Sequence, residues 1–163
     1  MGRDIDVRVV RKYKDGSIKE LNKLICVNWL TEVYEDMESF DSCENDIKKE
    51  YKTNYSELIT MSDERLKDFI VDYKAKVEEA KADYDFANKA YMGYCASGNY
   101  NEEMEDTLKS NVHYAKGNVS EYEENLKFFE KVKSYFEMVS NYTYVDNRDY
   151  NGFTDYLVIE MSW

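Results

Sequence analysis

The stretch LKDFIVDYKAKVEEAKADYDFANKAYMGY, residues 66–94, decides the fold predicted for this chain. Apolar and small residues recur in it at alternating steps of four and three, the heptad spacing of a helix with one apolar edge. Alanine and tyrosine fill much of this edge, where leucine and isoleucine are usual. We call this edge the seam; its positions are Leu66, Ile70, Tyr73, Val77, Ala80, Tyr84, Ala87, Tyr91 and Tyr94.

The surrounding residues predict where this helix begins and ends. A serine followed by two carboxylates at residues 62–64 is a typical helix start, and Gly98 suits a left-handed cap at its end. A helix over 63–96 is about 50 Å long at 1.5 Å per residue. The same four-and-three spacing continues over 102–141 and predicts a second long helix. Because about five residues join the two helices, they are expected to run antiparallel.

Both chain ends read as β-structure. Ile5, Val7 and Val9 alternate with polar residues, Asp15-Gly16 suits a tight turn, and residues 17–21 return as a second strand. Residues 153–161 form another apolar strand, in which Phe153, Leu157, Ile159 and Met161 share a face. We expect this strand to pair near the N-terminal hairpin. The predicted fold class is therefore α+β and mostly α, with a small antiparallel sheet of the chain ends and a long antiparallel helical hairpin.

The region between the first hairpin and the long helix is less regular. Residues 24–30 fit either a strand or the approach to a short helix that begins near Trp29. The apolar residues that follow are spaced for short amphipathic helices. They are Val33, Met37, Phe40, Ile47, Tyr51, Tyr55 and Leu58. The predicted organisation is a head made of residues 1–62 and 142–163, and a hairpin over 63–141.

The chain is acidic, with a net charge of -12 over 163 residues, and it contains no proline. Residues 31–64 hold eleven acidic and three basic side chains, whereas residues 1–30 hold seven basic and four acidic ones. An acidic surface repels nucleic-acid backbones, so direct binding of DNA or RNA is not expected. Such a surface suits either solubility or a basic groove on another protein.

The sequence gives no sign of secretion or membrane insertion. Its beginning, MGRDIDVRVV, lacks the apolar core of a signal peptide, and no apolar run approaches the length of a membrane span. Cys26, Cys43 and Cys95 are widely spaced and match neither a disulfide framework nor a zinc site. A cytoplasmic protein without a cofactor is expected.

No catalytic signature appears, and the chain is expected not to be an enzyme. The lone histidine, His113, has no ligand residue near it in sequence. Asp4 and Asp6 share one face of a strand and, with Glu160 from a neighbouring strand, resemble the oxygen cluster that holds a divalent cation in a nuclease. Solvent-facing charge is the competing interpretation. Residues 147–152 imitate the start of a calcium loop but lack its closing glutamate.

The opening residues Met1-Gly2-Arg3-Asp4-Ile5 resemble the start of small uncharacterised phage-encoded proteins that begin Met-Gly-x-Asp-Ile. The resemblance covers these five residues. It implies a phage gene expressed in a bacterial host, and it implies no activity.

Three hypotheses of function follow. The first is a non-enzymatic acidic module that binds a host or defence protein as an inhibitor and occludes a basic, nucleic-acid-binding surface. The second is an oligomeric structural or assembly protein that uses the helical arm, and the third is the small metal-dependent nuclease. The candidate partner-binding residues are of two kinds: acidic residues of the segment 31–64, and aromatic residues and one methionine of the first long helix and the loop after it. They are Glu32, Glu35, Asp36, Glu38, Asp41, Glu44, Phe69, Phe86, Tyr91, Met92, Tyr94 and Tyr100.

Three apolar residues of the first long helix lie off the seam, namely Phe69, Phe86 and Met92. A single partner helix cannot cover all of them. Each is therefore expected to contact the head, another subunit or a target.

Overall fold

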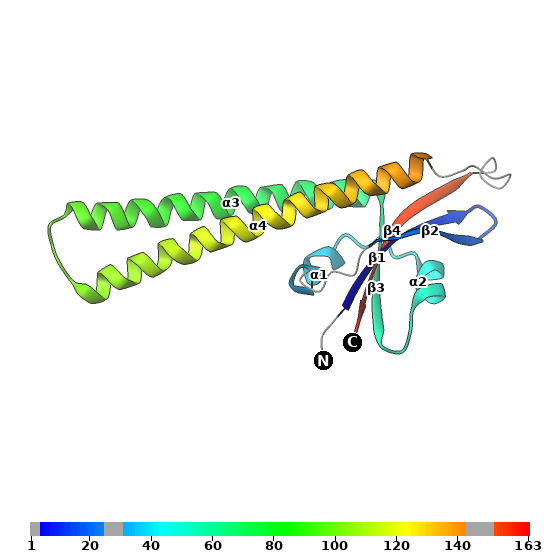
Figure 1. Ribbon diagram of the computed structural model, residues 1–163, viewed down its shortest axis with the longest axis horizontal. Coiled ribbons are helices and arrows are strands. Elements are labelled where there is room, and N and C mark those ends of the chain that lie inside the picture. Colours follow the sequence, from blue (N-terminus) through cyan, green and yellow to red (C-terminus); the bar gives the residue numbers. More distant parts are fainter. Residues whose placement is uncertain (1–3, 25–30, 143–151) are drawn as a thin grey trace. The chain divides into compact units, whose positions relative to one another are not determined.

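The structure, a computed structural model, describes residues 4–24, 31–142 and 152–163. It is an α+β fold dominated by two long helices, which confirms the fold class predicted from the sequence (Figure 1). The elements in chain order are β1 (Asp4–Tyr13), β2 (Ile18–Leu24), α1 (Thr31–Glu38), α2 (Asn45–Tyr51), β3 (Ser56–Ser62), α3 (Asp63–Ala96), α4 (Glu102–Tyr142) and β4 (Phe153–Ser162).

The four strands form one antiparallel sheet in the order β2-β1-β4-β3. β1 and β4 pair over their full lengths, from Asp4 opposite Ser162 to Tyr13 opposite Phe153. The prediction that the C-terminal strand returns to the N-terminal hairpin is thus confirmed. The turn of that hairpin depends on Gly16, whose φ of 88° is readily adopted only by glycine.

The strand β3 was not expected, and the sequence prediction was wrong there. Tyr55 and Leu58 were assigned to an amphipathic helix, but α2 ends at Tyr51 and residues 56–62 pair with β4. The apolar spacing was misleading because Leu58, Ile59 and Met61 are all buried, so this strand buries both of its faces and shows no simple alternation. The uncertain assignment of residues 24–30 falls mostly on residues 25–30, which lie outside the described residues.

One face of the sheet is covered by α2. Val10, Leu58, Tyr156 and Val158 project from three strands on this face, and Ile47 of α2 completes a buried cluster with them. Figure 1 shows α2 beside the strands on this side. Each fully buried side chain of this size stabilises the fold by about 1.5–3 kcal/mol, which holds a helix of only seven residues in place.

The end of α4 lies on the opposite face. Arg11 and Asp155 are cross-strand neighbours on β1 and β4, and both project onto this face. The Arg11 guanidinium donates to both carboxylate oxygens of Asp155, at 2.7 and 2.9 Å, and to the Ser140 carbonyl of α4 at 3.1 Å. The Ser140 hydroxyl also donates to Asp155. These four hydrogen bonds attach the last turn of α4 to the sheet.

The ends of the long helices follow the sequence signals. The Ser62 hydroxyl accepts a hydrogen bond from the Arg65 amide, as expected of a cap at the start of α3. Gly98 has a φ of 73° after the end of α3. The Asn101 side-chain oxygen accepts from the Met104 amide and caps α4. The loop between the helices is thus specified by its own residues.

The chain divides into two compact units. Unit 1 comprises residues 1–69 and 131–163, and unit 2 comprises residues 70–130. The predicted boundaries, 62/63 and 141/142, follow the helix ends, whereas the units divide within α3 and α4. Unit 1 therefore includes the sheet, α1, α2, the beginning of α3 and the end of α4.

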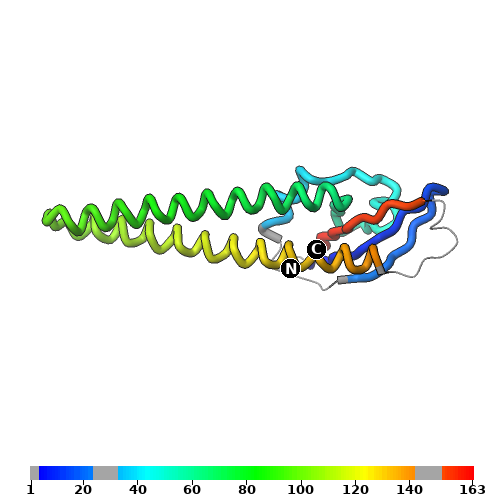
Figure 2. The backbone as a smooth tube through the Cα atoms, turned by 90° about the horizontal axis from the view of Figure 1, so that it is seen from above, coloured from blue at the N-terminus to red at the C-terminus, as the bar shows by residue number. Residues whose placement is uncertain are grey.

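Unit 2 consists of the two antiparallel stretches of α3 and α4 with the loop between them (Figure 2). Near residue 73 the seam is tightly packed: the Tyr73 ring makes edge contacts with Tyr122 and Phe129, and its hydroxyl accepts from the buried Asn125 amide at 2.9 Å. Toward the loop the seam residues Tyr84, Ala87, Tyr91 and Tyr94 are only half-buried. The packing of unit 2 weakens toward its loop.

Within the described ranges, no helix combines the length and the apolar character that a membrane crossing requires.

Candidate functional site

Two of the three carboxylates suggested as metal ligands, Asp6 and Glu160, are paired with basic side chains. Asp6 and Glu160 are directly opposite on β1 and β4, as the sequence indicated. Arg8, however, donates to Glu160 at 2.7 Å and lies 3.9 Å from Asp6, and Lys23 lies 3.2 Å from Asp6. Asp4 is opposite Ser162, two pairs further along, and is exposed. The charges of Asp6 and Glu160 are therefore compensated within the sheet.

No group of three or more histidine, cysteine, aspartate or glutamate side chains is placed to hold a metal ion among residues 4–24, 31–142 and 152–163. The imitation of a calcium loop at residues 147–151 lies outside these ranges, and only Gly152 at its end is described.

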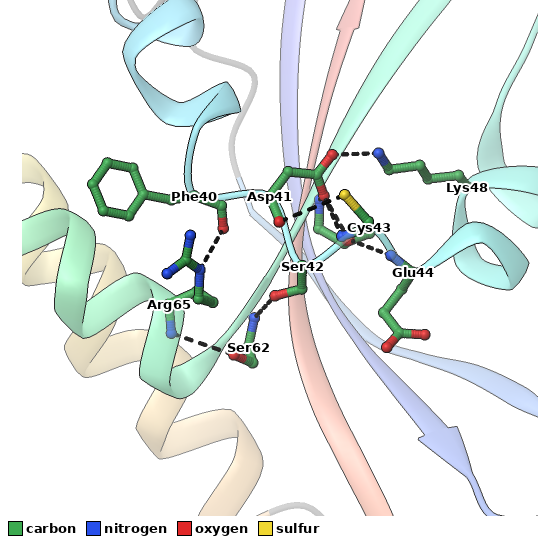
Figure 3. Close-up of polar contacts among 9 residues, drawn as sticks. Phe40, Asp41, Ser42, Cys43, Glu44, Lys48, Ser62 and Arg65 are labelled. Carbon is green, nitrogen blue, oxygen red and sulfur yellow. Dashed lines mark hydrogen bonds and ion pairs between the residues drawn. The ribbon is translucent and has the colours of Figure 1, made fainter.

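Asp41 is hydrogen-bonded to several parts of unit 1 (Figure 3). One of its carboxylate oxygens accepts from the Cys43 amide at 2.9 Å, from the Thr60 amide at 3.1 Å and from the Thr60 hydroxyl at 2.9 Å. The other oxygen accepts from the Lys48 ammonium group. Asp41 thus joins the loop before α2, α2 itself and β3.

The adjacent Ser42 continues this connection along β3. Its amide donates to the Thr60 carbonyl at 2.6 Å, and its hydroxyl accepts from the Ser62 amide at 3.0 Å (Figure 3). β3 is an edge strand, and Asp41 and Ser42 pair with the outer edge of its C-terminal half. This protects the edge from pairing with another chain.

The environment of Asp41 favours its ionised form. Burial by itself would raise the pKa of Asp41, but the hydrogen bonds from Lys48, from the two amides and from the Thr60 hydroxyl outweigh burial and lower this pKa below its ordinary value of 3.8. The ionised carboxylate is therefore a structural part of the fold at neutral pH.

We expect Asp41→Asn to lower the free energy of unfolding at pH 7 by about 1.5–3 kcal/mol, because it removes a charge-assisted contact at a largely buried site. The folded-state pKa lies below the unfolded one, so the stabilisation is complete above pH 3.8 and is lost as the pH falls through the folded-state value. Urea unfolding of both proteins at pH 7 and pH 3 measures this difference.

The control is Asp46→Asn, which removes an exposed partner of Lys12 and should cost less than about 1 kcal/mol. A stability difference between wild type and Asp41→Asn that is as large at pH 3 as at pH 7 would contradict the assigned pKa direction.

Glu44 also makes contacts within unit 1. One carboxylate oxygen accepts from the Lys12 ammonium group at 3.0 Å, and the other accepts from the Tyr156 hydroxyl at 2.8 Å. Burial and this bond to Glu44 raise the pKa of Tyr156 to about 12 from its ordinary value of 10. Burial first, and the bond to Glu44 second, therefore keep this phenol on β4 neutral.

We expect Tyr156→Phe to flatten the loss of stability between pH 10 and pH 12. In the wild-type protein the unfolded state ionises Tyr156 near pH 10 and the folded state does so near pH 12, so this residue contributes stability below pH 10 that is lost over this interval. The loss is roughly 2–3 kcal/mol at 1.36 kcal/mol per pKa unit. Chemical denaturation at pH 9 and pH 12 measures it, with Tyr55→Phe, an exposed tyrosine, as control. Equal slopes for Tyr156→Phe and wild type would refute the assignment.

The remaining acidic candidates lie on α1. Glu35, Asp36 and Glu38 are exposed, whereas the side chain of Glu32 lies outside the described part of the chain. The acidic segment therefore contains two kinds of residue: Asp41 and Glu44 hold the fold together, and Glu35, Asp36 and Glu38 face solvent on a helix whose other side, with Val33 and Met37, is buried.

A cavity of about 350 Å³ lies beside Asp41 at the edge of the sheet. Its lining combines the buried Tyr34 of α1, residues of β3 and charged side chains of both signs. Sequence reasoning did not identify this site, because β3 was not predicted and Tyr34 had no distinctive neighbours. The lining residues are Tyr34, Glu38, Asp41, Lys48, Lys52, Glu57, Leu58 and Ile59.

The aromatic candidates differ in how far they are exposed. Phe69 is fully buried and its ring packs edge-on against Phe40 at 5.4 Å, so it contacts unit 1 rather than a target. Tyr91 is half-buried in the seam of unit 2. The Tyr94 hydroxyl accepts from the Asn101 amide at 2.6 Å and donates to its carbonyl at 2.8 Å, which closes the loop.

The other candidates are exposed near the loop of unit 2. Phe86 is 78% exposed, Met92 61% and Tyr100 77%. Tyr114, which the sequence did not single out, is 72% exposed. Since α3 and α4 are antiparallel, Phe86 and Tyr114 lie at similar distances from the loop, ten and twelve residues from the adjoining helix ends at Ala96 and Glu102. We call the exposed large apolar side chains of residues 86–114 the hairpin-end set; they are Phe86, Met92, Tyr100, Met104 and Tyr114.

Comparisons with known proteins give no relationship: no family model, no curated protein and no solved structure matches this chain.

Proposed function

We propose that this chain is a non-enzymatic, acidic protein-binding module that contacts its partner through the hairpin-end set. The partner is a protein with a basic surface, such as the nucleic-acid-binding groove of a host or defence protein. Binding would occlude that groove. In this proposal the chain acts as an inhibitor, in keeping with the phage origin expected from its first residues.

The observation that carries the proposal is the exposure of Phe86, Tyr100 and Tyr114 at more than 70% each, with Met92 and Met104 also exposed. Single exposed apolar side chains are common on soluble proteins, but large aromatic ones gathered at one end of a hairpin are characteristic of interfaces. Tyrosine, phenylalanine and methionine are enriched where proteins bind one another. Half-buried seam residues beside them add apolar area to the same end.

Charge selects the class of partner. Residues 70–130 contain thirteen acidic and seven basic side chains, and four of the acidic ones are Glu102, Glu103, Glu105 and Asp106 at the start of α4. An acidic rim around apolar contacts accelerates encounter with a basic surface and disfavours acidic partners and nucleic acid. Apolar anchors would supply most of the affinity, and the carboxylates would supply the selectivity.

The test is capture from a lysate of the native host cell, followed by competition. The immobilised protein is expected to retain a partner with a basic surface, and heparin, a polyanion, is expected to release it because both occupy the same groove. Raising the salt concentration should weaken capture, since exposed charges are screened over about 8 Å at physiological ionic strength. A retained partner that heparin does not displace would contradict occlusion of a basic groove, and no retained partner would contradict the proposal as a whole.

A second candidate function is self-association through the same end of the hairpin. The half-burial of Tyr84, Ala87 and Tyr91 favours it, because a second copy could complete the coverage of this seam. Light scattering at increasing protein concentration separates the two candidates. A monomeric mass throughout would exclude assembly through the arm, and a dimeric mass that reverts to monomer on Tyr91→Lys would favour it.

A further inference from the structure

The outer edge of β3, on the side away from β4, is hydrogen-bonded to other described residues in its C-terminal half but not at Leu58. At Thr60 and Ser62 the outward amide groups, and the Thr60 carbonyl, are paired with Asp41 and Ser42. In an antiparallel sheet the backbone groups of alternate residues point to the same side. The N–H and C=O of Leu58 therefore also point outward, away from β4. No hydrogen bond on this side joins Leu58 to any residue in the described ranges.

Leu58 lines the cavity of about 350 Å³, together with its neighbours Glu57 and Ile59. α1 contributes Tyr34 and Glu38 to the lining of the same cavity. The cavity therefore lies beside the part of the β3 edge that Asp41 and Ser42 do not cover. An open pair of backbone groups beside a cavity offers one donor and one acceptor to an incoming chain.

Tyr34 brings a side-chain hydroxyl to the same cavity. Its side chain lines the cavity, and the residue is only 2% exposed. Burial, together with the nearby carboxylates of Glu57 and Glu38, raises the pKa of Tyr34, so the phenol stays neutral and can both donate and accept.

From these contacts we propose that the edge of β3 at Leu58 binds an extended peptide segment of a partner protein, which adds a short strand to the sheet. The peptide pairs one residue with the N–H and C=O of Leu58, and the Tyr34 hydroxyl bonds to the peptide backbone beside it. Strand addition of this kind takes its affinity from main-chain hydrogen bonds and its selectivity from adjoining pockets.

The charges around the cavity indicate the side chain that the peptide carries. Lys48 is engaged by Asp41, which leaves the exposed Glu38 and Glu57 facing the single exposed Lys52. A basic residue of the peptide would be placed between the two glutamates. The covered edge at Thr60 limits pairing to the stretch around Leu58, so a segment of only a few residues is bound.

This site goes beyond the proposed function, because it lies in unit 1 and uses none of the hairpin-end set. The two can fail separately. If the hairpin-end set is irrelevant, peptide binding at Leu58 is unaffected, and if Leu58 binds nothing, capture of a folded partner by unit 2 remains.

The experiment uses the full chain and a phage-displayed library of random heptapeptides as the probe. Peptides selected by the wild-type protein are expected to carry a basic residue. Synthetic versions of these peptides are then titrated by fluorescence polarisation. Hydrogen exchange of the wild-type protein is expected to show slower exchange of the Leu58 amide with peptide than without it, and this readout needs no variant.

Two variants and one control locate the binding. Tyr34→Phe removes only the hydroxyl and should weaken binding roughly fivefold to tenfold, as loss of one hydrogen bond of about 1 kcal/mol implies. Glu38→Gln with Glu57→Gln should weaken binding of peptides with a basic residue by a similar factor. The matched control is Glu79→Gln with Glu124→Gln, two exposed glutamates of unit 2, which should leave the affinity unchanged.

Three results would overturn the proposal. They are the absence of any enriched peptide, peptides that bind Tyr34→Phe and wild type equally, and binding without protection of the Leu58 amide. Circular dichroism of Tyr34→Phe confirms that its fold is intact, so that weaker binding is attributed to the lost hydroxyl.

Discussion

Asp155→Ala is expected to lower the free energy of unfolding by about 3–5 kcal/mol, as breaking a buried ion pair does when one charge is left behind. The side chains of Arg11 and Asp155 are only 1% and 4% exposed. Without Asp155, the Arg11 guanidinium stays buried and loses two hydrogen bonds, and Ser140 of α4 loses its acceptor. Urea unfolding monitored by circular dichroism measures the change.

The double variant Arg11→Met with Asp155→Leu separates the charge from the packing. Replacing both charges with apolar side chains removes the desolvation cost of the pair, so the double variant is expected to be more stable than Asp155→Ala alone. Lys67→Ala, which removes an exposed ion pair with Asp63, is the control and should change the stability little. A double variant less stable than Asp155→Ala would show that the pair is needed for more than charge compensation.

Replacing three members of the hairpin-end set should abolish partner binding without unfolding the protein. The variant Phe86→Ser, Tyr100→Ser and Tyr114→Ser is expected to bind the captured partner at least roughly 100-fold more weakly, since truncation of aromatic anchors at an interface commonly costs 2 kcal/mol or more each. The three side chains are already exposed, so the stability should change by about 0.5 kcal/mol or less per site. Titration calorimetry with the purified partner measures the affinity.

The matched control is Tyr55→Ser with Val71→Ser. Both residues are exposed by about two-thirds, but Tyr55 lies in unit 1 and Val71 lies at the end of unit 2 away from the loop. The control should bind as the wild type does. An equal loss of affinity in the control and in the triple variant would mean that binding depends on overall apolar surface rather than on the hairpin end.

The parts of the fold that local sequence determines were predictable. The seam of residues 66–94, the start at Ser62 and the cap at Gly98 act within a few residues of the chain, and they defined α3 well. The alternation around Val7 and the turn at Gly16 did the same for the first hairpin. In each case the physical cause is a periodicity or a backbone preference that needs no distant contact.

The prediction failed where long-range pairing decides the structure. Residues 56–62 become a strand because β4 provides backbone partners for them and because both faces of the sheet bury their side chains. Ile59 and Thr60 are β-branched and favour a strand, but the spacing of Ile47, Tyr51, Tyr55 and Leu58 fits a helix equally well. Helical periodicity is ambiguous over such a short segment.

The same limitation explains which candidate residues were misjudged. Asp41 and Glu44 looked like surface charge, yet their partners Thr60 and Tyr156 lie 19 and 112 residues further along the chain. Phe69 was expected to contact the head, another subunit or a target, and of these it contacts the head, where it packs on Phe40. Phe86 and Met92 were identified correctly as apolar residues that the seam does not cover. Sequence spacing identifies a side chain that its own helix pair leaves uncovered, but it does not show what else covers that side chain.

Site-specific photo-crosslinking shows directly whether the end of the hairpin contacts a protein partner. The photoreactive residue p-benzoylphenylalanine is introduced at position 86, at position 114 and, as a control, at position 71, and each protein is irradiated with the captured partner. A covalent adduct is expected from positions 86 and 114, and none from position 71. An adduct from position 71 alone, or no adduct from position 86 while the partner stays bound, would contradict this expectation.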